Sequence, residues 1–348
     1  MSVSFRQGIR WPAALLLAAL FLPVFFLTGC SKPVANVVSH SGMTMGTSFT
    51  VKWVSSDSSI DAELPSLINQ VLVDVNNSMS TYQANSELTR INQLPAGSSV
   101  TVSAGLAEVL QRALEISQKS DGAFDVTVGP LVNLWGFGPD GRIIKAPADD
   151  EISTLMARVG YQYLDFDVQQ ATLLKQRDIY IDLSAIAKGY GVDRVARQLE
   201  SKGITSYLVE VGGELRAKGL KPDGVSWKVA IEAPVIGDRQ IQRIVAVNNV
   251  GIATSGDYRN YFEENGVRFS HTINPADGKP IRHRLASVTV LADDCASADA
   301  LATAMMVMGP ERAEAFASQQ GVEALLIVKT DTGFTEIMTP GFSKFLVQ

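Results

Sequence analysis

The sequence predicts an α+β fold in which mixed, mainly antiparallel sheets are packed with helices. Three candidate strands, at residues 227–232, 241–248 and 251–254, follow one another at short spacing, as in an antiparallel meander. Segments with apolar residues at helical spacing lie between most of the other strands. Strands and helices do not, however, alternate regularly along the chain as they do in a doubly wound sheet. Beyond the first 30 residues the sequence has no repeat and no low-complexity segment. We therefore expect one tightly joined unit with a large core.

The N-terminal segment has the features of a signal peptide. Arg6 and Arg10 precede an apolar run at residues 13–27, which Pro23 interrupts. This length suits a signal peptide better than a permanent membrane span. The ending Leu27-Thr28-Gly29-Cys30 resembles the lipobox of bacterial lipoproteins, which implies that the cysteine is lipidated and becomes the first mature residue.

This resemblance divides the chain into three parts. We expect a signal peptide at residues 1–29, a lipidated tether at 30–40 and a folded domain at 41–348. Lipidation at Cys30 implies a location on the periplasmic side of a bacterial membrane, and the choice between inner and outer membrane stays open.

Charge and cysteine content exclude some functions. The formal net charge is −6, and it becomes −8 when Arg6 and Arg10 are removed with the signal peptide. An acidic chain without a basic run has no electrostatic footprint for nucleic acid. Cys295 is the only cysteine besides Cys30, so we expect no internal disulfide and a small buried thiol.

The other elements follow from periodicity. Helices are predicted where apolar residues recur every three or four positions, at residues 60–76, 102–120, 149–159, 297–308 and 312–319, with further helices beginning near Ser86 and Ser184. Strands are predicted where β-branched and aromatic residues gather, at residues 49–54, 163–166, 171–174, 179–183, 207–211, 285–291 and 324–328, with a last short strand behind them.

The most informative stretch covers residues 179–193. A short buried strand at 179–183 is followed by Ser184 at an expected helix N-cap. Asp182, Ser184 and Lys188 would then surround one helix start, where backbone N–H groups favour anions such as phosphate. The alternative is an ordinary capped helix after a strand, and the sequence alone leaves both open.

A second stretch predicts a cation site. Ser297 is expected to cap a helix on which Asp299 and Thr303 lie four residues apart, so their oxygens share one face. Such a pair suits Mg²⁺, which takes few carboxylates and completes its shell with water and phosphate oxygens. The alternative is that Asp299 complements the helix dipole and Thr303 bonds to its own backbone.

His271 is the histidine best placed for catalysis. It follows a predicted strand and precedes a loop rich in glycine and proline, a usual place for functional groups. His40 lies in the expected tether, and His283 is expected to be solvated between two arginines. A structural role for His271 is the competing interpretation.

Several motif matches are rejected. Residues 136–141 satisfy G-x-G-x-x-G, but no strand precedes them and Pro139 interrupts them. Ser184 and Lys188 are one residue too far apart for the S-x-x-K of penicillin-binding enzymes, which disfavours an acyl-serine enzyme.

An ordered series of short motifs resembles the ApbE family, the bacterial FAD:protein FMN transferases. The motifs span almost the whole chain after the tether: Met45-Gly46-Thr47, Met79-Ser80-Thr81-Tyr82, Gly122-Ala123-Phe124-Asp125, Val128-Gly129-Pro130-Leu131-Val132, the run from Asp182 to Tyr190, Glu210-Val211-Gly212-Gly213-Glu214, Ser255-Gly256-Asp257-Tyr258, His271-Thr272-Ile273-Asn274-Pro275 and Ala298-Asp299-Ala300-Leu301-Ala302-Thr303. Each motif is short, and their joint order makes the resemblance specific.

The resemblance implies an activity and a set of site residues. FAD is split at its pyrophosphate, AMP leaves, and the FMN phosphoryl is joined to a threonine or serine hydroxyl of an acceptor flavoprotein. FAD lies in a central cleft, and its contacts are implied to be Met45, Tyr82, Ala123, Phe124, Asp125, Asp182, Lys188 and Ile273. The Mg²⁺ ligands are implied to be the Ala185 carbonyl, Asp299 and Thr303, and His271 is implied to deprotonate the acceptor hydroxyl.

One position departs from the family pattern. Asn274 stands where many members have aspartate before proline. If that aspartate orients the histidine, another carboxylate is needed here, and we expect Asp257 to supply it.

The implied partners are FAD, the membrane through the lipid anchor, and acceptor subunits such as those of Na⁺-translocating NADH:quinone oxidoreductase or related redox complexes. Two alternatives remain at this point: a Mg²⁺-dependent FAD pyrophosphatase, and a periplasmic lipoprotein that binds FAD without transferring it.

Overall fold

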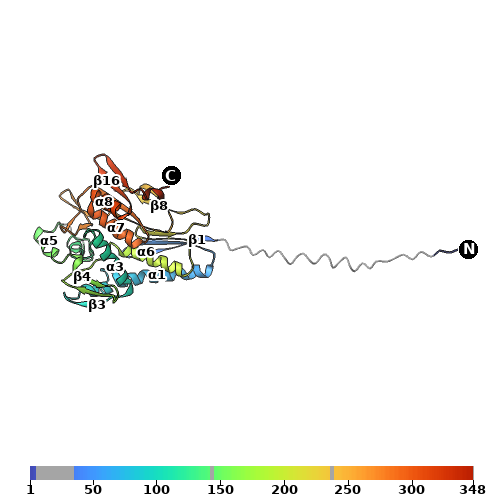
Figure 1. Ribbon diagram of the computed structural model, residues 1–348, viewed down its shortest axis with the longest axis horizontal. Helices are drawn as coiled ribbons and strands as arrows, with labels where there is room; N and C mark the ends of the chain where they lie inside the picture. The colour runs from blue at the N-terminus through green and yellow to red at the C-terminus, as the bar shows by residue number, and fades with distance from the viewer. Residues whose placement is uncertain (5–34, 142–144, 236–238, 348) are drawn as a thin grey trace. The chain divides into compact units, whose positions relative to one another are not determined.

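The fold is organised around an eight-stranded sheet in which every neighbouring pair of strands is antiparallel (Figure 1). In spatial order its strands are β1 (Asn36–Thr44), β2 (Thr47–Ser55), β6 (Tyr207–Val211), β7 (Glu214–Lys218), β10 (Val250–Gly256), β15 (Leu285–Ala292), β16 (Glu323–Thr330) and β17 (Gly333–Met338). The computed structural model describes residues 1–4, 35–141, 145–235 and 239–347. This sheet lies within the unit Ala35–Gln348, and it confirms the predicted α+β fold with mainly antiparallel strands.

Four smaller sheets complete the strand structure, and they too are antiparallel. They are formed by β3 (Ser99–Thr101), β5 (Thr172–Lys175) and β4 (Leu164–Asp167); by β8 (Trp227–Glu232) and β9 (Ile241–Val247); by β11 (Tyr261–Glu264) and β12 (Val267–Ser270); and by β13 (Ile273–Asn274) and β14 (Lys279–Pro280).

The helices of the described chain are α1 (Ser58–Met79), α2 (Glu87–Asn92), α3 (Ala104–Lys119), α4 (Gly129–Leu134), α5 (Asp149–Met156), α6 (Ala187–Ser201), α7 (Cys295–Met308) and α8 (Pro310–Gln320), with 3-10 turns at η1 (Tyr161–Tyr163) and η2 (Phe342–Phe345). Of these, α1, α6, α7 and α8 cover one side of the main sheet. Figure 1 shows α6 between α1 and α7, and α7 packs on β10 and β15. No helix in the described part of the chain is both long and apolar enough to cross a membrane.

Two core regions explain this arrangement. Apolar side chains of β2 and β6 pack with α1 and α6, and those of β15 and β16 pack with α7 and α8. On the opposite face β8, β9 and η2 cover β10, β15 and β16. Strand β15 is therefore buried on both faces, which explains its continuous run of apolar and small residues.

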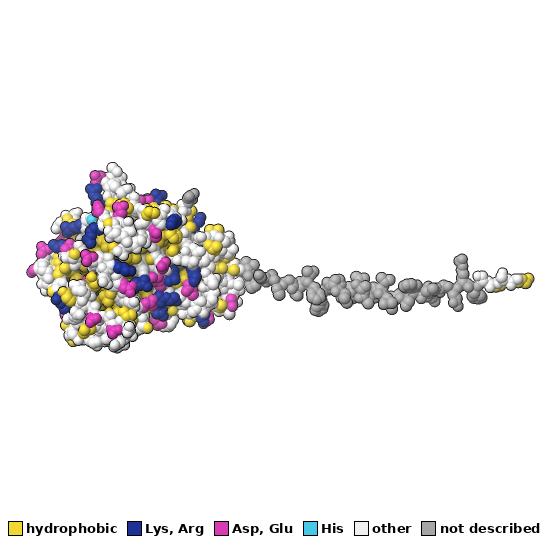
Figure 2. Space-filling model, in the orientation of Figure 1, with side chains coloured by type: hydrophobic (Ala, Val, Ile, Leu, Met, Phe, Trp, Pro, Cys, Tyr) yellow, Lys and Arg dark blue, Asp and Glu magenta, His cyan; other side chains and the backbone are white. Residues whose placement is uncertain are grey.

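The surface of the unit mixes both signs of charge. Over the face drawn in Figure 2, Lys and Arg side chains are interspersed with Asp and Glu. Ion pairs join neighbouring elements on the surface, such as the pair of Lys202, directly after α6, with Glu63 on α1. Exposed pairs of this kind stabilise the fold only slightly.

The predicted C-terminal end of the tether, at residue 40, is wrong. Residues 36–40 belong to β1, which pairs with β2 in continuous register from Asn36 opposite Ser55 to Thr44 opposite Thr47. His40 lies in this strand, where its ring meets Phe49 edge-on. The expected signal peptide, apart from residues 1–4, and Cys30 lie outside the described residues.

Residues 179–183 are buried and extended, but they are not a strand. The side chain of Asn92 takes the place of a strand partner, since it accepts a bond from Ile181 N–H and donates one to the Ile181 carbonyl. Asp182 N–H adds a single bond to the Val126 carbonyl. A single amide side chain can pair with only one residue, so the segment has the composition of a strand but belongs to no sheet.

Two expected helix caps are also wrong. Helix α6 begins at Ala187 after a turn, with Ile186 at the N-cap, so the Ser184 hydroxyl bonds to Asp182 instead. Helix α7 begins two residues earlier than expected, because the Asp294 side chain accepts the Ser297 N–H and caps it.

Candidate functional site

A cavity of about 870 Å³ opens where α6, α7, β7 and β10 meet. Eleven predicted site residues line it: Tyr82, Ala123, Phe124, Asp125, Asp182, Ala185, Lys188, His271, Ile273, Asp299 and Thr303. They come from segments scattered over most of the chain, so the fold brings them together. The volume is within the range of sites for large organic ligands.

Met45 does not line this cavity. Its side chain packs against Gly191 of α6 and Leu72 of α1, between two core regions. Thr47 and Ser48, which follow it on β2, reach the cavity instead.

A charged cluster forms part of the cavity wall. Lys188 Nζ lies 3.5 Å from Glu214 Oε1 and 3.9 Å from Asp299 Oδ2. Both carboxylates are buried, and Glu214 Oε2 has no hydrogen-bond partner among the described residues. The cluster therefore holds one more negative than positive charge when all three groups are ionised.

Burial and the charges of the neighbouring groups shift the pKa values of Glu214, Asp299 and Lys188. Burial raises the pKa of Glu214 to about 8, with Lys188 opposing the shift and Asp299 adding to it. Burial also raises the pKa of Asp299, while Lys188 and the Gly189 N–H oppose that shift. For Lys188, burial alone would lower the pKa, but attraction to Asp299 and Glu214 outweighs it and raises the pKa.

A tight turn places Glu214 in this cluster. Gly212 and Gly213 join β6 to β7 with φ values of 63° and 104°, which favour glycine. A Cβ on Gly212 would lie 2.8 Å from Thr47 Cγ2 and 3.4 Å from Lys188 Cδ. The positive φ and the close Thr47 methyl together favour glycine at position 212.

Neutral oxygens complete the surroundings of Asp299. Thr303, one turn further along α7, has its hydroxyl 3.2 Å from that of Ser255 on β10. The Gly189 N–H donates to Asp299 Oδ2 at 3.1 Å instead of to the carbonyl of Ala185 one turn earlier. The Ala185 carbonyl thus has no hydrogen-bond donor among the described residues and stays available to a ligand.

These groups fit a divalent cation. A buried carboxylate, a free carbonyl and a nearby hydroxyl are the oxygen ligands that a hard cation such as Mg²⁺ takes. The described residues contain no group of three or more His, Cys, Asp or Glu side chains able to hold a metal ion. A cation here would therefore depend on carbonyl and hydroxyl oxygens beside Asp299.

His271 lies at another wall, directly after β12. Its Nδ1 is 3.0 Å from the Asn260 carbonyl, which can only accept, so the proton is assigned to Nδ1 and the lone pair to Nε2. Burial lowers the pKa of His271, and Lys188 lowers it further, while the bond to Asn260 opposes the shift. The imidazole is therefore neutral near pH 7, with Nε2 able to accept a proton, and Phe137 meets its ring edge-on.

The expected role of Asp257 is wrong. Its carboxylate forms an ion pair with Lys329, and the Asn260 carbonyl occupies Nδ1 of His271. Asn274 does not orient the histidine either, since its side chain accepts the N–H of Ala276 in a turn.

His283 is not the solvated residue expected from its arginine neighbours. Its ring packs against Gly309, and its Nε2 is buried without a hydrogen-bond partner in the described chain.

Two predicted contact residues also shape the cavity wall. Asp125 accepts bonds from Thr127 and from the N–H of Tyr161, so its carboxylate holds the loop after α3. Asp182 accepts the N–H and hydroxyl of Ser184, which fixes the turn before α6. Tyr82 is 66% exposed at the rim.

Several lining residues were not predicted as part of the site. Glu214 and Ser255 lie within the short motifs shared with the family, and both line the cavity. On the wall formed by β8 and β9, Glu232 pairs with Arg239 and Arg259, and all three line the cavity. A carboxylate directly after a Gly-Gly pair was the available signal for Glu214.

The fold and this cavity define an enzyme with a site for a large, charged ligand. The chain belongs to the ApbE family, whose sequence model matches residues 45–326. A FAD:protein FMN transferase of Vibrio cholerae is 47% identical over 339 residues, which cover 97% of this chain and 99% of that protein. One of Haemophilus influenzae is 44% identical and covers 91% of this chain and 94% of its own length.

Solved structures show the same fold. The flavin transferase ApbE from Vibrio cholerae superposes with a TM-score of 0.83 at 46% sequence identity and covers 90% of this chain and all of its own.

Proposed function

We propose that this chain is a FAD:protein FMN transferase, which splits FAD at the pyrophosphate, releases AMP and joins FMN to a hydroxyl of an acceptor protein. The observation that carries the proposal is that His271 and the cluster of Lys188, Glu214 and Asp299 line one cavity. The transferase relatives, which match over nearly the full length, support the same activity.

The chain's own groups suit each part of this reaction. Nε2 of neutral His271 would take the proton from a threonine or serine hydroxyl as the new phosphoester bond forms. The Lys188 ammonium would neutralise an oxygen of the pyrophosphate. The buried surfaces of Ala123, Phe124 and Ile273 would hold apolar parts of FAD.

Asp299, Thr303 and the Ala185 carbonyl would hold Mg²⁺. When bound, the cation would neutralise pyrophosphate charge during in-line displacement. The buried Asp299 carboxylate and the free Ala185 carbonyl support this assignment. Tyr82, Asp125 and Asp182 would complete the polar contacts to FAD, and Met45 would act only through packing.

The location and the acceptor belong to the same proposal. Lipidation at Cys30 would tether the domain to the periplasmic side of a membrane, which the lipobox supports. Acceptor subunits like those of Na⁺-translocating NADH:quinone oxidoreductase or related redox complexes would then present their hydroxyls on that side.

The experiment that tests the proposal follows AMP release and protein-bound flavin together, with FAD, Mg²⁺ and an acceptor domain carrying an exposed threonine. Both products should appear with the wild-type protein and be lost in Asp299→Ala. AMP without bound flavin would favour the FAD pyrophosphatase. Tight FAD binding with neither product would favour the storage lipoprotein.

A further inference from the structure

Asp193 joins the three elements that carry the charged cluster. It lies on the buried side of α6, 1% exposed, five residues after Lys188. Its Oδ1 accepts the Cys295 N–H at 3.1 Å, and its Oδ2 accepts the Ala296 N–H at 2.9 Å. These are the first two N–H groups of α7, which have no partner within their own helix.

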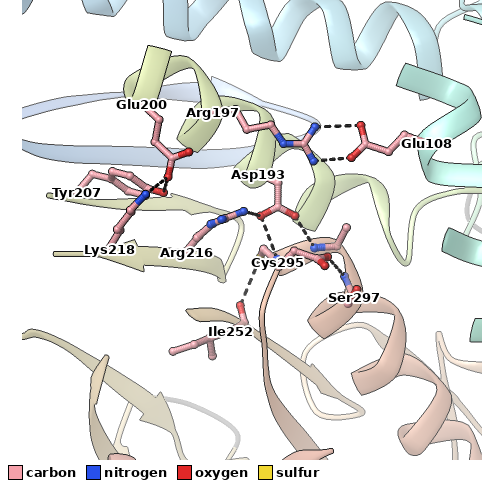
Figure 3. Close-up of polar contacts among 12 residues, drawn as sticks. Glu108, Asp193, Arg197, Glu200, Tyr207, Arg216, Lys218, Ile252, Cys295 and Ser297 are labelled. Carbon is pink, nitrogen blue, oxygen red and sulfur yellow. Dashed lines mark hydrogen bonds and ion pairs between the residues drawn. The ribbon is translucent and has the colours of Figure 1, made fainter. Parts of the chain in front are cut away.

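Arg216 holds this carboxylate from the sheet. Its Nη1 donates to Asp193 Oδ1 at 2.7 Å, and Arg216 stands on β7 two residues after Glu214. Figure 3 shows Asp193 between Arg216 and the start of α7. One carboxylate therefore connects α6, β7 and α7.

The contact between α6 and α7 is so close that it leaves no room for a side chain at Gly189. A Cβ on Gly189 would stand 2.3 Å from the Cys295 carbonyl oxygen. The same glycine donates its N–H to Asp299, one turn along α7 from Cys295. The position of Asp299 beside Lys188 thus depends on where the first turn of α7 is held.

We propose that Asp193 is a positioning residue for the cation site, with Arg216 as its partner. It fixes the first turn of α7 against α6 and so sets the distance from Asp299 and Thr303 to Lys188 and the Ala185 carbonyl. This rests on the cation site of the proposed function. A group that acts through others in this way contributes to metal affinity without touching the metal.

The test measures cation affinity directly, in Asp193→Asn and in Arg216→Met, by titrating the folded proteins with Mn²⁺ and recording free Mn²⁺ by electron paramagnetic resonance. Asp193→Asn keeps the size of the side chain and loses one acceptor and the charge. We expect Mn²⁺ affinity to fall by about 10- to 100-fold. The Mg²⁺ concentration that gives half-maximal AMP release should rise in parallel. At saturating Mg²⁺ the kcat of the variant should return to the wild-type value.

Glu200→Gln is the matched control. Glu200 also lies on α6, and in the described chain its carboxylate bonds to Lys218 of β7 and Tyr207 of β6 instead of to α7. Arg216→Lys, which keeps the charge, should recover part of the affinity lost in Arg216→Met. Thermal unfolding shows which variants are folded at the temperature of the titration.

The outcomes separate the two proposals. Unchanged Mn²⁺ affinity in folded Asp193→Asn, or an equal loss in Glu200→Gln, would overturn the positioning role while leaving the cation site in place. If the wild-type protein and Asp299→Ala bind Mn²⁺ equally, the cation site itself is wrong, and the positioning role falls with it.

Discussion

Replacing Lys188 with methionine tests whether its ammonium compensates two buried carboxylates. The side chain keeps most of its length and loses both ion pairs, to Glu214 at 3.5 Å and to Asp299 at 3.9 Å. Removing one partner of a buried pair leaves an uncompensated charge, which costs about 3–5 kcal/mol of unfolding free energy. We expect a loss of this size for Lys188→Met at about pH 8.

The loss should depend on pH. Because the folded pKa of Glu214 is raised to about 8 from 4.5, this group contributes stability that is present below pH 4.5 and is lost as the pH rises through about 8. Without the lysine the pKa values of Glu214 and Asp299 rise further, since Lys188 lowers both. The variant should therefore approach wild-type stability at about pH 5 and fall behind as the pH rises.

Thermal and urea unfolding between about pH 5 and pH 9, without divalent cations, measures this difference. Lys202→Met is the control, because it breaks an exposed pair with Glu63 and should cost about 0–1 kcal/mol at every pH. The double variant Lys188→Met with Glu214→Gln should recover much of the loss. Equal stability of Lys188→Met and the wild type at high pH would refute the reasoning.

Three further predictions concern single residues. His271→Ala should lower flavin transfer by about 10²- to 10⁴-fold with FAD affinity retained, and a matching loss of FAD binding would contradict a role as base. Because the pKa of His271 is lowered, wild-type activity should be at its plateau at neutral pH and fall on acidification. Asn274→Asp should leave the pH–rate profile unchanged, since the side chain bonds to the Ala276 N–H, and a shifted profile would show that it acts on the histidine. Lys175→Met should lower the free energy of unfolding, measured by urea unfolding, by about 3 kcal/mol or more, because the buried ammonium donates to three main-chain carbonyls around the end of α2. A loss below about 1 kcal/mol would contradict this role of the ammonium.

Alternation and periodicity predicted most elements of the fold. Strands β2 and β6 and helices α1 and α3 appear where their apolar spacing placed them, because each buries one face against the core. Residues 179–183 have the same composition as a strand, yet their partner is the side chain of Asn92. Composition shows that a segment is buried and extended, and it cannot show what pairs with it.

The candidate site was predictable as a set of residues and not as a geometry. Asp299 and Thr303 share one face of α7 as their spacing required. The turn that carries Asp299 toward Lys188 is held by Asp193, two of whose partners are main-chain N–H groups about a hundred residues away along the chain. Main-chain donors leave no residue-type signal, so this connection could not be read from the sequence.

The measurement that tests the central claim most directly uses the chain from Ser31 onward, which contains the unit Ala35–Gln348, with FAD, Mg²⁺ and an acceptor domain bearing a threonine. Flavin fluorescence on a denaturing gel and AMP release are followed in the wild type, His271→Ala and Asp299→Ala. We predict covalent flavin and AMP in equal amounts from the wild type and neither at a comparable rate from the variants. AMP released at the wild-type rate without covalent flavin, for every acceptor offered, would contradict a transferase.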